Sequence, residues 1–199
     1  MARLQDLTGR RFGDSVNPLL VSVRSGAAVS MPGMMDTILN LGLNPRTVDA
    51  LARQSGNPRF AYDSYRRFIQ MYGDVVFGLT APAGEMDPFE RVLDNVKRRR
   101  KVKRDIDLDA EDLKAVVGKF HQIVERESSR PFPDNPWDQL WGAVEAVFRS
   151  WQTKRAADYR RVHRIPDDMG TAVSIVAMVY GNMGDDSGTG VALDRKSVV

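Results

Sequence analysis

Residues 19–26 read LLVSVRSG, an apolar run that ends in an arginine, a serine and a glycine. Its length and its β-branched valines predict a buried strand over 19–24, with Arg24 at the end of the strand. Small residues follow, so backbone amides can approach an anion closely, and the donor fork of a guanidinium matches two phosphate oxygens. Arg24 is therefore a candidate phosphate ligand. A solvent-facing arginine is the alternative, and the local pattern does not decide between them.

The segment that follows, SMPGMMDTILNLG (30–42), predicts a turn that enters a short helix. Pro32 and Gly33 favour the turn, and Gly42 favours a helix end after about residues 34–41. The segment also holds three of the nine methionines, Met31, Met34 and Met35. They are interpreted either as adaptable core filling or as the wall of a pocket for a flat ring.

Four further helices are predicted in the middle of the chain. Asn-Pro pairs at 44–45, 57–58 and 135–136 each place a capping residue before a first-turn proline. Gly56 and Gly73 indicate where the first two of these helices end. The fourth helix covers 109–127, with apolar residues on one side after an acidic first turn. The helix after 135 carries the three tryptophans on one apolar stripe, and we expect all three to be core anchors: Trp137, Trp141 and Trp151.

The two remaining segments complete an α+β fold, a helical middle flanked by β-strand elements. Residues 80–106 are rich in proline, glycine and charge and predict a linker or surface insertion. TAVSIVAMVYG (171–181) and GTGVALD (188–194) predict two strands that form a hairpin. A glycine-rich loop, GNMGDDSG (181–188), joins them. The stretch 184–190 offers backbone amides to phosphates, although a plain hairpin connection is the favoured interpretation.

Composition excludes several classes of protein. The 199 residues allow one domain or two small lobes. The absence of cysteine excludes a disulfide scaffold, a thiolate metal site and a cysteine nucleophile. No apolar run reaches the roughly 20 residues of a membrane span, and the first residues lack the apolar stretch of a signal peptide. We therefore expect a cytoplasmic protein without a membrane partner.

Positive charge is concentrated in one place. Seven of the eight residues at 97–104, KRRRKVKR, are cations, although the whole chain has a net charge of only +3. The rest of the chain is therefore mildly acidic. Such a run either binds phosphates or forms the solvated end of a helix or loop. We favour the solvated interpretation and disfavour nucleic acid as a partner.

The sequence does not indicate a metal centre. His121 and His163 have no zinc-site spacing; we expect His121 to be structural and His163 to be exposed. Two pairs of aspartates, at 167–168 and 185–186, offer oxygen ligands to a hard cation. Aspartate is also common in turns, which we favour here, so no metal ligand is assigned.

Four stretches together resemble pyruvate, phosphate dikinases. They are PLLVSVRSGAAVSMPGMMDTILNLGLN (18–44), RFAYDSYRRFIQMYGDVV (59–76), NPWDQLWGAVEAVFRSW (135–151) and IPDDMGTAVSIVAMVYGNMGDDSGTGVA (165–192). The resemblance is to part of the N-terminal nucleotide-binding domain, which has the ATP-grasp fold. It implies a β-containing lobe formed by 1–30 and 165–199 and a mainly helical subdomain over 31–164.

The resemblance also implies an activity and a set of site residues. Enzymes of this family use ATP, phosphate and pyruvate, with Mg²⁺, to make phosphoenolpyruvate, AMP and pyrophosphate. Their N-terminal domain phosphorylates a histidine on a swinging central domain, and a C-terminal barrel binds pyruvate. On matching positions Arg24 would clamp the ATP phosphates, and Met178 would lie at the hinge that meets adenine. The remaining matches are Gly33 and Met35, which would line the nucleotide site, and Thr189 and Gly190, which would lie against the phosphates.

The sequence departs from the family pattern at both ends. The family's N-terminal glycine-rich segment with its lysine, its magnesium ligands and its two other domains have no counterpart here, and LDRKSVV (193–199) replaces the usual FTRNPSTGE. We expect weak ATP binding without turnover, no catalytic residue within the chain and magnesium ligands outside it. An unpaired sheet edge would favour a homo-oligomer. A non-catalytic nucleotide-binding or interaction module is the alternative, and a nucleic-acid binder using 97–104 is a weaker one.

For the site itself, we expect Arg24 and the loop 184–190 to reach the same triphosphate.

Overall fold

Strand β3 (Val21–Ser25) is the middle strand of a three-stranded sheet in the order β4-β3-β5. The computed structural model describes residues 1–82 and 84–190. Both neighbours pair antiparallel to β3: β4 (Thr37–Leu41) on one side and β5 (Val173–Ala177) on the other. A separate pair, β1 (Arg11–Phe12) with β2 (Pro18–Leu19), is parallel.

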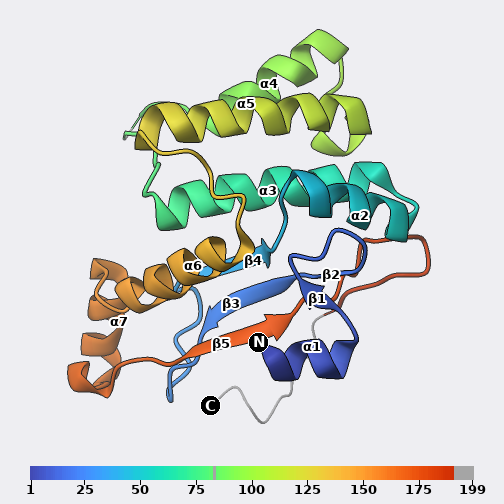
Figure 1. Cartoon of the computed structure of the whole chain (residues 1–199). Helices are drawn as coiled ribbons and strands as arrows, with labels where there is room; N and C mark the ends of the chain where they lie inside the picture. The colour runs from blue at the N-terminus through green and yellow to red at the C-terminus, as the bar shows by residue number, and fades with distance from the viewer. Residues whose placement is uncertain (83, 191–199) are drawn as a thin grey trace.

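Helices α2 to α6 lie in layers on one side of the sheet, as Figure 1 shows. The layer next to the sheet contains α2 (Pro45–Ser55), α3 (Pro58–Val76) and α6 (Pro136–Ser150). The outer layer contains α4 (Pro88–Arg100) and α5 (Ala110–Ser128), which pack over α3. The remaining helices are α1 (Ala2–Thr8), α7 (Lys154–His163) and two single 3₁₀ turns at Asp105–Asp107 and Asp167–Met169. The α+β class expected from the sequence is confirmed.

Side-chain caps begin five of the described helices, and in four of them the capping residue precedes a proline; the fifth is α5, where Asp109 accepts a hydrogen bond from the amide of Asp112. The Asn44 side chain accepts hydrogen bonds from the amides of Arg46 and Thr47, which completes a capping box at α2. Asn57, Asp87 and Asn135 cap α3, α4 and α6 in the same manner. The predicted starts at 44–45, 57–58 and 135–136 are therefore confirmed. Helix α3 continues to Val76, three residues beyond the predicted end at Gly73.

The helix predicted over about 34–41 is wrong, because residues 37–41 form strand β4. Ile38 and Leu41 are fully buried there, and the backbone pairs with β3. The segment is too short to form a stable helix alone, and sheet pairing outweighs its weak helical preference. Asn40 and Gly42 have positive φ angles of 64° and 103°, which a helix does not contain.

The expected linker or surface insertion at 80–106 contains helix α4. Phe89, Leu93 and Val96 lie on one face of α4 and are buried in the main core. Phe89 packs edge-to-face on Phe120 of α5, with ring centroids 4.8 Å apart. The many charged residues of this stretch lie on the other side of the helix and hide its apolar periodicity. The division of the chain into two lobes stays a prediction.

The first of the two predicted C-terminal strands is confirmed as β5. Residues 188–190, at the start of the second, do not form a strand, and 191–194 lie outside the described residues. The hairpin therefore stays a prediction. The prediction that all three tryptophans anchor the core is wrong: Trp151 is buried, whereas Trp137 is 45% exposed and Trp141 is 62% exposed. A different stripe of α6, with Leu140, Ala143 and Val147, faces the core.

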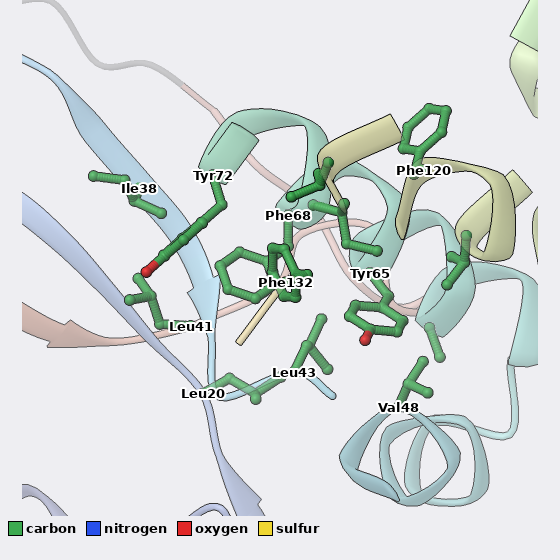
Figure 2. Close-up of a cluster of buried hydrophobic side chains, with 14 of the residues drawn as sticks. Leu20, Ile38, Leu41, Leu43, Val48, Tyr65, Phe68, Tyr72, Phe120 and Phe132 are labelled. Carbon is green, nitrogen blue, oxygen red and sulfur yellow. The ribbon is translucent and has the colours of Figure 1, made fainter. Parts of the chain in front are cut away.

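Aromatic rings from α3 and from the segment before α6 fill the space over β4 (Figure 2). Phe132 lies edge-to-face against Phe68 and Tyr72, with centroids 5.4 and 5.3 Å away. Gln139, which is completely buried, joins α6 to the corner between β4 and α2. Its side chain accepts a hydrogen bond from the amide of Gly42 at 2.9 Å and donates to the carbonyls of Leu43 and Pro133 at 2.9 and 2.7 Å.

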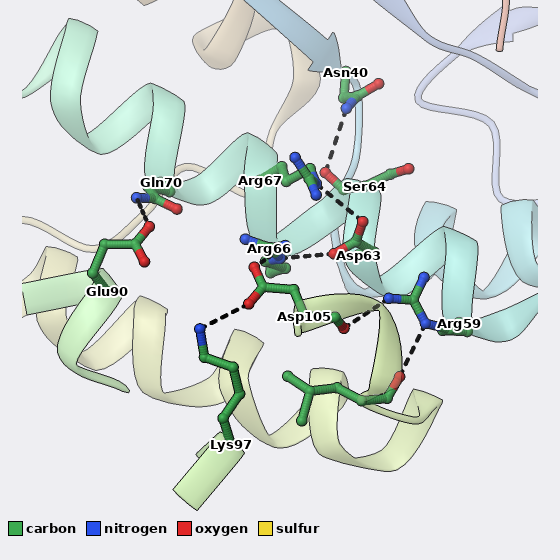
Figure 3. Close-up of polar contacts among 11 residues, drawn as sticks. Asn40, Arg59, Asp63, Ser64, Arg66, Arg67, Gln70, Glu90, Lys97 and Asp105 are labelled. Carbon is green, nitrogen blue, oxygen red and sulfur yellow. Dashed lines mark hydrogen bonds and ion pairs between the residues drawn. The ribbon is translucent and has the colours of Figure 1, made fainter. Parts of the chain in front are cut away.

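A buried ion-pair network joins α3 to the connection between α4 and α5 (Figure 3). The Arg66 guanidinium contacts Asp63 at 2.8 Å and Asp105 at 3.1 Å. Lys97 reaches the other oxygen of Asp105 at 3.0 Å, and Arg59 donates to the Asp105 carbonyl at 2.8 Å. The start of the basic run is therefore part of the packed structure. Arg66 is buried beside two carboxylates, so its charge is compensated.

We predict that Gln139→Ala lowers the free energy of unfolding by about 3 kcal/mol. The truncation leaves one buried amide and two buried carbonyls without their partners. Gln122, which lies exposed on α5, is the matched control, and Gln122→Ala should change stability by less than about 0.5 kcal/mol. Urea unfolding of the two variants checks this. Equal stabilities would show that Gln139 does not hold the corner.

Asp74, near the end of α3, makes stability depend on pH. Burial, helped by Asp87 and Glu90, raises its pKa from 3.8 to about 6, and its Oδ1 atom is buried without a hydrogen bond among the described residues. A raised pKa means that the folded state favours the protonated carboxyl. The contribution of Asp74 to stability is therefore present at low pH and is lost as the pH rises through about 6.

We expect Asp74→Asn to stabilise the fold at neutral pH by about 1–2 kcal/mol, a value reduced for partial exposure. Its advantage over the wild type should disappear toward about pH 4, where the carboxyl is protonated. Asp168, exposed in a 3₁₀ turn, provides the control Asp168→Asn. Urea unfolding across this pH range is the measurement. A stability difference that does not vary with pH would contradict the assignment.

Candidate functional site

Arg24 projects from β3 on the face opposite to its buried valines. Val21 and Val23 are completely buried, and Arg24 is exposed. Its Nε donates a hydrogen bond to Ser22 Oγ at 3.3 Å, so the side chain lies back along the strand over Ser22. Within the part of the chain that the structure describes, no carboxylate pairs with Arg24. The two outer nitrogens of its guanidinium form no hydrogen bond among the described residues, and the residue is exposed, so they are available to an anion.

The segment after β3 forms a cleft beside Arg24. This cleft has a volume of about 460 Å³, and its lining includes Arg24, Gly33 and Met35. Gly33 has a positive φ angle of 73°, which turns the chain back toward β4. Gly26 directly follows β3. A Cβ at this position would lie 3.1 Å from Ser174 Oγ, so a glycine lets the chain pass close to β5. Three of the predicted site residues are thus brought together.

Contacts from α6 and α7 hold the far wall of this cleft. Ser150 Oγ accepts a hydrogen bond from the amide of Asp36 at 3.2 Å. Arg155 pairs with the Asp36 carboxylate and donates from Nε to the carbonyl of Met34 at 3.1 Å. Met31 is buried with Trp151 in a small second core, against which Met34 and Met35 also pack. Core filling is thus confirmed for Met31, whereas Met34 and Met35 are half-buried. Met31 and Met35 also line the cleft, so the interpretation as a pocket wall stays a prediction.

Met178 lies at the opposite end of the β3–β5 pair. The register places Arg24 opposite Ser174, whereas the amide of Met178 donates to the carbonyl of Leu20 at 2.9 Å. Four residues of strand separate these two ends, which corresponds to about 13 Å. Met178 lines two adjoining hollows of about 300 and 410 Å³. Both hollows also contact the same three further side chains, Arg10, Tyr180 and Met183.

Two contacts fix the side chain of Tyr180, which lines both hollows. Its hydroxyl donates to Asn40 Oδ1 at 3.0 Å, and its ring packs edge-to-face on Phe60 with centroids 5.0 Å apart. Burial raises the pKa of the Tyr180 hydroxyl, so it stays protonated. With Met178 and Met183 it forms an apolar surface, while Arg10 supplies a cation at the edge. Such a surface suits a flat ring that carries polar substituents.

Thr189 and Gly190 are exposed at the same end as Met178. A Cβ placed on Gly181 would collide with Thr189 Cγ2, which shows how closely the loop folds back on itself. The loop is also tied to the start of α3, because Asn57 Nδ2 donates to the carbonyl of Met183 at 3.3 Å. In Figure 1 this loop and the carboxyl end of β3 lie at opposite ends of the β3–β5 pair. The expected meeting of Arg24 and the loop 184–190 does not occur in this conformation.

Three side chains of this region were not singled out from the sequence: Ser22, Arg10 and Tyr180. Ser22 is a hydroxyl in an otherwise apolar strand and lies two residues before Arg24, so its spacing was a usable signal. Arg10 and Tyr180 carry no such signal. Only the tertiary fold brings these two to Met178.

The described residues contain no group of three or more histidine, aspartate or glutamate side chains placed to hold a metal ion. Asp167 pairs with Arg160 at 2.7 Å, and residues 184–187 form a turn closed by a hydrogen bond from Ser187 to Gly184.

His121 bonds the Tyr65 hydroxyl at 3.0 Å, and exposed His163 stacks on Tyr159. Both histidines therefore have the roles expected from the sequence.

The basic run 97–104 ends α4, and several of its cations are paired. Arg100 contacts Asp109 at 2.5 Å and Asp112 at 2.8 Å, and Arg104 contacts Asp107 at 2.8 Å. Cations in the last turn of a helix also interact favourably with its dipole. The solvated helix end is therefore the interpretation that the structure supports. Carboxylates already neutralise part of the charge that nucleic acid would need.

Comparison with known proteins identifies the family. A family model described as "Pyruvate phosphate dikinase, AMP/ATP-binding domain" matches residues 1–198. The chain belongs to this family. It is 56% identical over 193 residues to a pyruvate, phosphate dikinase of Clostridium symbiosum, a match that covers 96% of the chain and 22% of that relative.

Other relatives agree with this assignment. A pyruvate, phosphate dikinase of Rhizobium meliloti (strain 1021) is 51% identical over 98% of the chain and 21% of the relative. The chloroplastic pyruvate, phosphate dikinase 1 of Arabidopsis thaliana is 52% identical over 94% of the chain and 19% of the relative. The chain thus spans about a fifth of the length of these relatives. The resemblance noted from the sequence is confirmed.

The described helices include none that is long and apolar enough to cross a lipid bilayer. The relatives include proteins named as chloroplastic, so the cytoplasmic location stays a prediction.

We predict that Gly181→Ala displaces the loop from its position beside Met178. The added methyl would meet Thr189 and would lie 2.8 Å from the backbone oxygen of Gly188, closer than carbon and oxygen pack. Hydrogen exchange of residues 182–190 should become faster while that of α3 and α5 stays unchanged. Gly118→Ala is the control, because a Cβ there meets nothing within 4 Å. Unchanged exchange in 182–190 would contradict the close packing.

Proposed function

We propose that this chain is the ATP-binding part of a pyruvate, phosphate dikinase. That enzyme would convert ATP, phosphate and pyruvate to phosphoenolpyruvate, AMP and pyrophosphate through a phosphohistidine. The family assignment supports nucleotide binding, and the position of Arg24 carries the proposal for this chain. The guanidinium of Arg24 has no carboxylate partner among the described residues. Its hydrogen bond to Ser22 holds it beside an open cleft.

The proposed nucleotide spans the two ends of the β3–β5 pair. Its phosphates lie in the cleft with Arg24 and Gly33, and its adenine lies against Met178 in the hollows at the other end. Arg24 offers paired donors to phosphate oxygens and offsets the charge that develops as a phosphoryl group is transferred. The ATP-grasp architecture is part of this proposal.

Thr189 and Gly190 are proposed to lie against the phosphates. In the structure Thr189 packs on Gly181, at the adenine end. Reaching phosphates held by Arg24 therefore requires the segment from Gly181 onward to move toward β3. The two glycines beside Thr189, at 188 and 190, give the backbone the freedom for such a movement.

These residues bind and orient; they do not supply acid or base chemistry. The lining of the Arg24 cleft contains no carboxylate and no histidine. The nearby Asp36 carboxylate is paired with Arg155. The described residues therefore do not fit a magnesium site. Phosphoryl transfer to a histidine, and pyruvate binding in a barrel, are proposed for the other parts of the longer dikinase, and the 199-residue chain is expected to bind ATP without turnover.

Titration calorimetry with ATP and its pieces tests this arrangement. Arg24→Ala should weaken ATP binding about ten- to a hundredfold, as expected for the loss of a charge-assisted hydrogen-bonding group. Adenosine affinity should not change, because adenosine has no phosphate. Arg24→Lys should recover part of the ATP affinity, since it keeps the charge and loses the fork.

Arg99→Ala is the matched control, because it removes the same charge from an exposed position on α4. It should leave both affinities unchanged. ATP binding that survives Arg24→Ala would overturn the phosphate role of Arg24. Equal losses in Arg24→Ala and Arg99→Ala would show that only overall charge matters.

A further inference from the structure

Helix α6 has a second apolar stripe that faces solvent. It consists of Trp137, Trp141, Val144 and Phe148, which we call the α6 seam. Three of these large side chains are 45%, 62% and 49% exposed, in the order Trp137, Trp141, Phe148. A surface helix normally carries one apolar stripe, and here that stripe is already used by Leu140, Ala143 and Val147 in the core. The seam is thus an apolar face with no partner among the described residues.

The spacing of the seam indicates what shape of partner fits it. Its residues follow one another at intervals of four, three and four. This is the alternation of a and d positions in a heptad, the pattern by which one helix packs along another. The seam is also prearranged at one end, because Trp137 packs edge-to-face on Phe12 with centroids 5.5 Å apart. A partner helix would therefore meet an ordered surface.

The charges beside the seam indicate the chemistry of that partner. Asp138 and Glu145 are exposed, lie seven residues apart and follow Trp137 and Val144 directly, at the e positions of the same heptad. Among the described residues neither of them forms an ion pair. The other flank of the seam is the buried core stripe. Arg149 lies on the same flank and donates a hydrogen bond to the carbonyl of Val76 at 3.2 Å, so two carboxylates and one cation border the seam there. A partner is therefore met mainly by carboxylates along its exposed edge, which favours lysine or arginine in that position.

The same charges disfavour a second copy of this chain. Two seams packed against each other would bring the acidic flanks of both copies into one interface, where like charges repel. An occupant with basic flanks has to come from another stretch of polypeptide. The relatives are about five times as long as the part matched here, so a full-length dikinase has ample chain outside these 199 residues.

We propose that the α6 seam is a docking surface for an amphipathic helix with basic flanks, contributed by polypeptide outside residues 1–199. Trp141 is the central anchor, and Asp138 and Glu145 select the charge of the helix. The proposal does not depend on nucleotide binding, because the seam shares no residue with the Arg24 cleft or with the hollows beside Met178.

Two synthetic three-heptad helical peptides test the proposal on the purified chain. Both carry leucine at every a and d position; one has lysine and the other glutamate at every e and g position. Binding is followed by tryptophan fluorescence, since two of the three tryptophans lie in the seam. We expect the lysine peptide to bind at least tenfold more tightly than the glutamate peptide.

Variants assign the binding to the seam. Trp141→Ala should lower affinity for the lysine peptide at least tenfold, whereas Leu7→Ala, at an exposed leucine of α1, should not change it. The double variant Asp138→Lys, Glu145→Lys should reverse the preference and favour the glutamate peptide. All these side chains are exposed, so the variants should fold, and circular dichroism checks this.

Three outcomes would overturn the proposal. Neither peptide binding would show that the seam is not a helix-docking surface. Equal binding of the two peptides, unchanged by the double variant, would show that the flanking acids select nothing. A dimer in light scattering that dissociates on Trp141→Glu would show that a second copy of the chain is the occupant.

Discussion

The candidate site depends on the register in which β3 pairs with its two neighbours. Successive side chains of a strand point to opposite faces, so the burial of Val21 and Val23 places Ser22 and Arg24 on the other face. A slip of one residue would bury the guanidinium and expose two valines, which costs free energy on both counts. β4 and β5 fix the register from both edges, where Arg24 lies opposite Thr37 and Ser174. Apolar packing on one side of the sheet thus sets the position of a charge on the other.

Helix α6 fixes the position of the segments on either side of strand β4. Through Gln139 it holds the corner after β4, and through Ser150 it holds the turn that closes the Arg24 cleft. The two contacts lie near opposite ends of one helix. The cleft wall and the sheet therefore cannot shift independently without breaking buried hydrogen bonds. The same helix presents its remaining apolar stripe, the α6 seam, to solvent. A partner bound at the seam would therefore contact the helix that also positions the Arg24 cleft.

Local signals in the sequence predicted those parts of the fold that local physics determines. An asparagine followed by proline favours a helix start, and the three predicted Asn-Pro starts are correct. A fourth pair, Asn17-Pro18, begins strand β2 instead, so the pair is a preference and not a rule. Strand β4 was mistaken for a helix because its backbone bonds come from β3, thirteen or more residues away in the chain. The tryptophans of α6 were placed together because periodicity shows that residues share a stripe but not which stripe faces the core. Arg24 was found from its position at a strand end, whereas its lack of a carboxylate partner is a tertiary property.

The separation of Arg24 from Met178 restricts the ligands that suit this site. About 13 Å of strand lies between the two ends, so no compact ligand touches both. Inorganic phosphate would engage only the Arg24 cleft, and a nucleoside only the apolar hollows beside Tyr180. A nucleoside triphosphate carries an anionic end and a flat apolar end on one extended molecule, which is the combination that the two ends of the sheet present. Each end alone is shallow and open to solvent, so each contact alone should be weak. Most of the affinity should come from linking the two contacts in one ligand, because joining two weak binding groups raises their combined affinity.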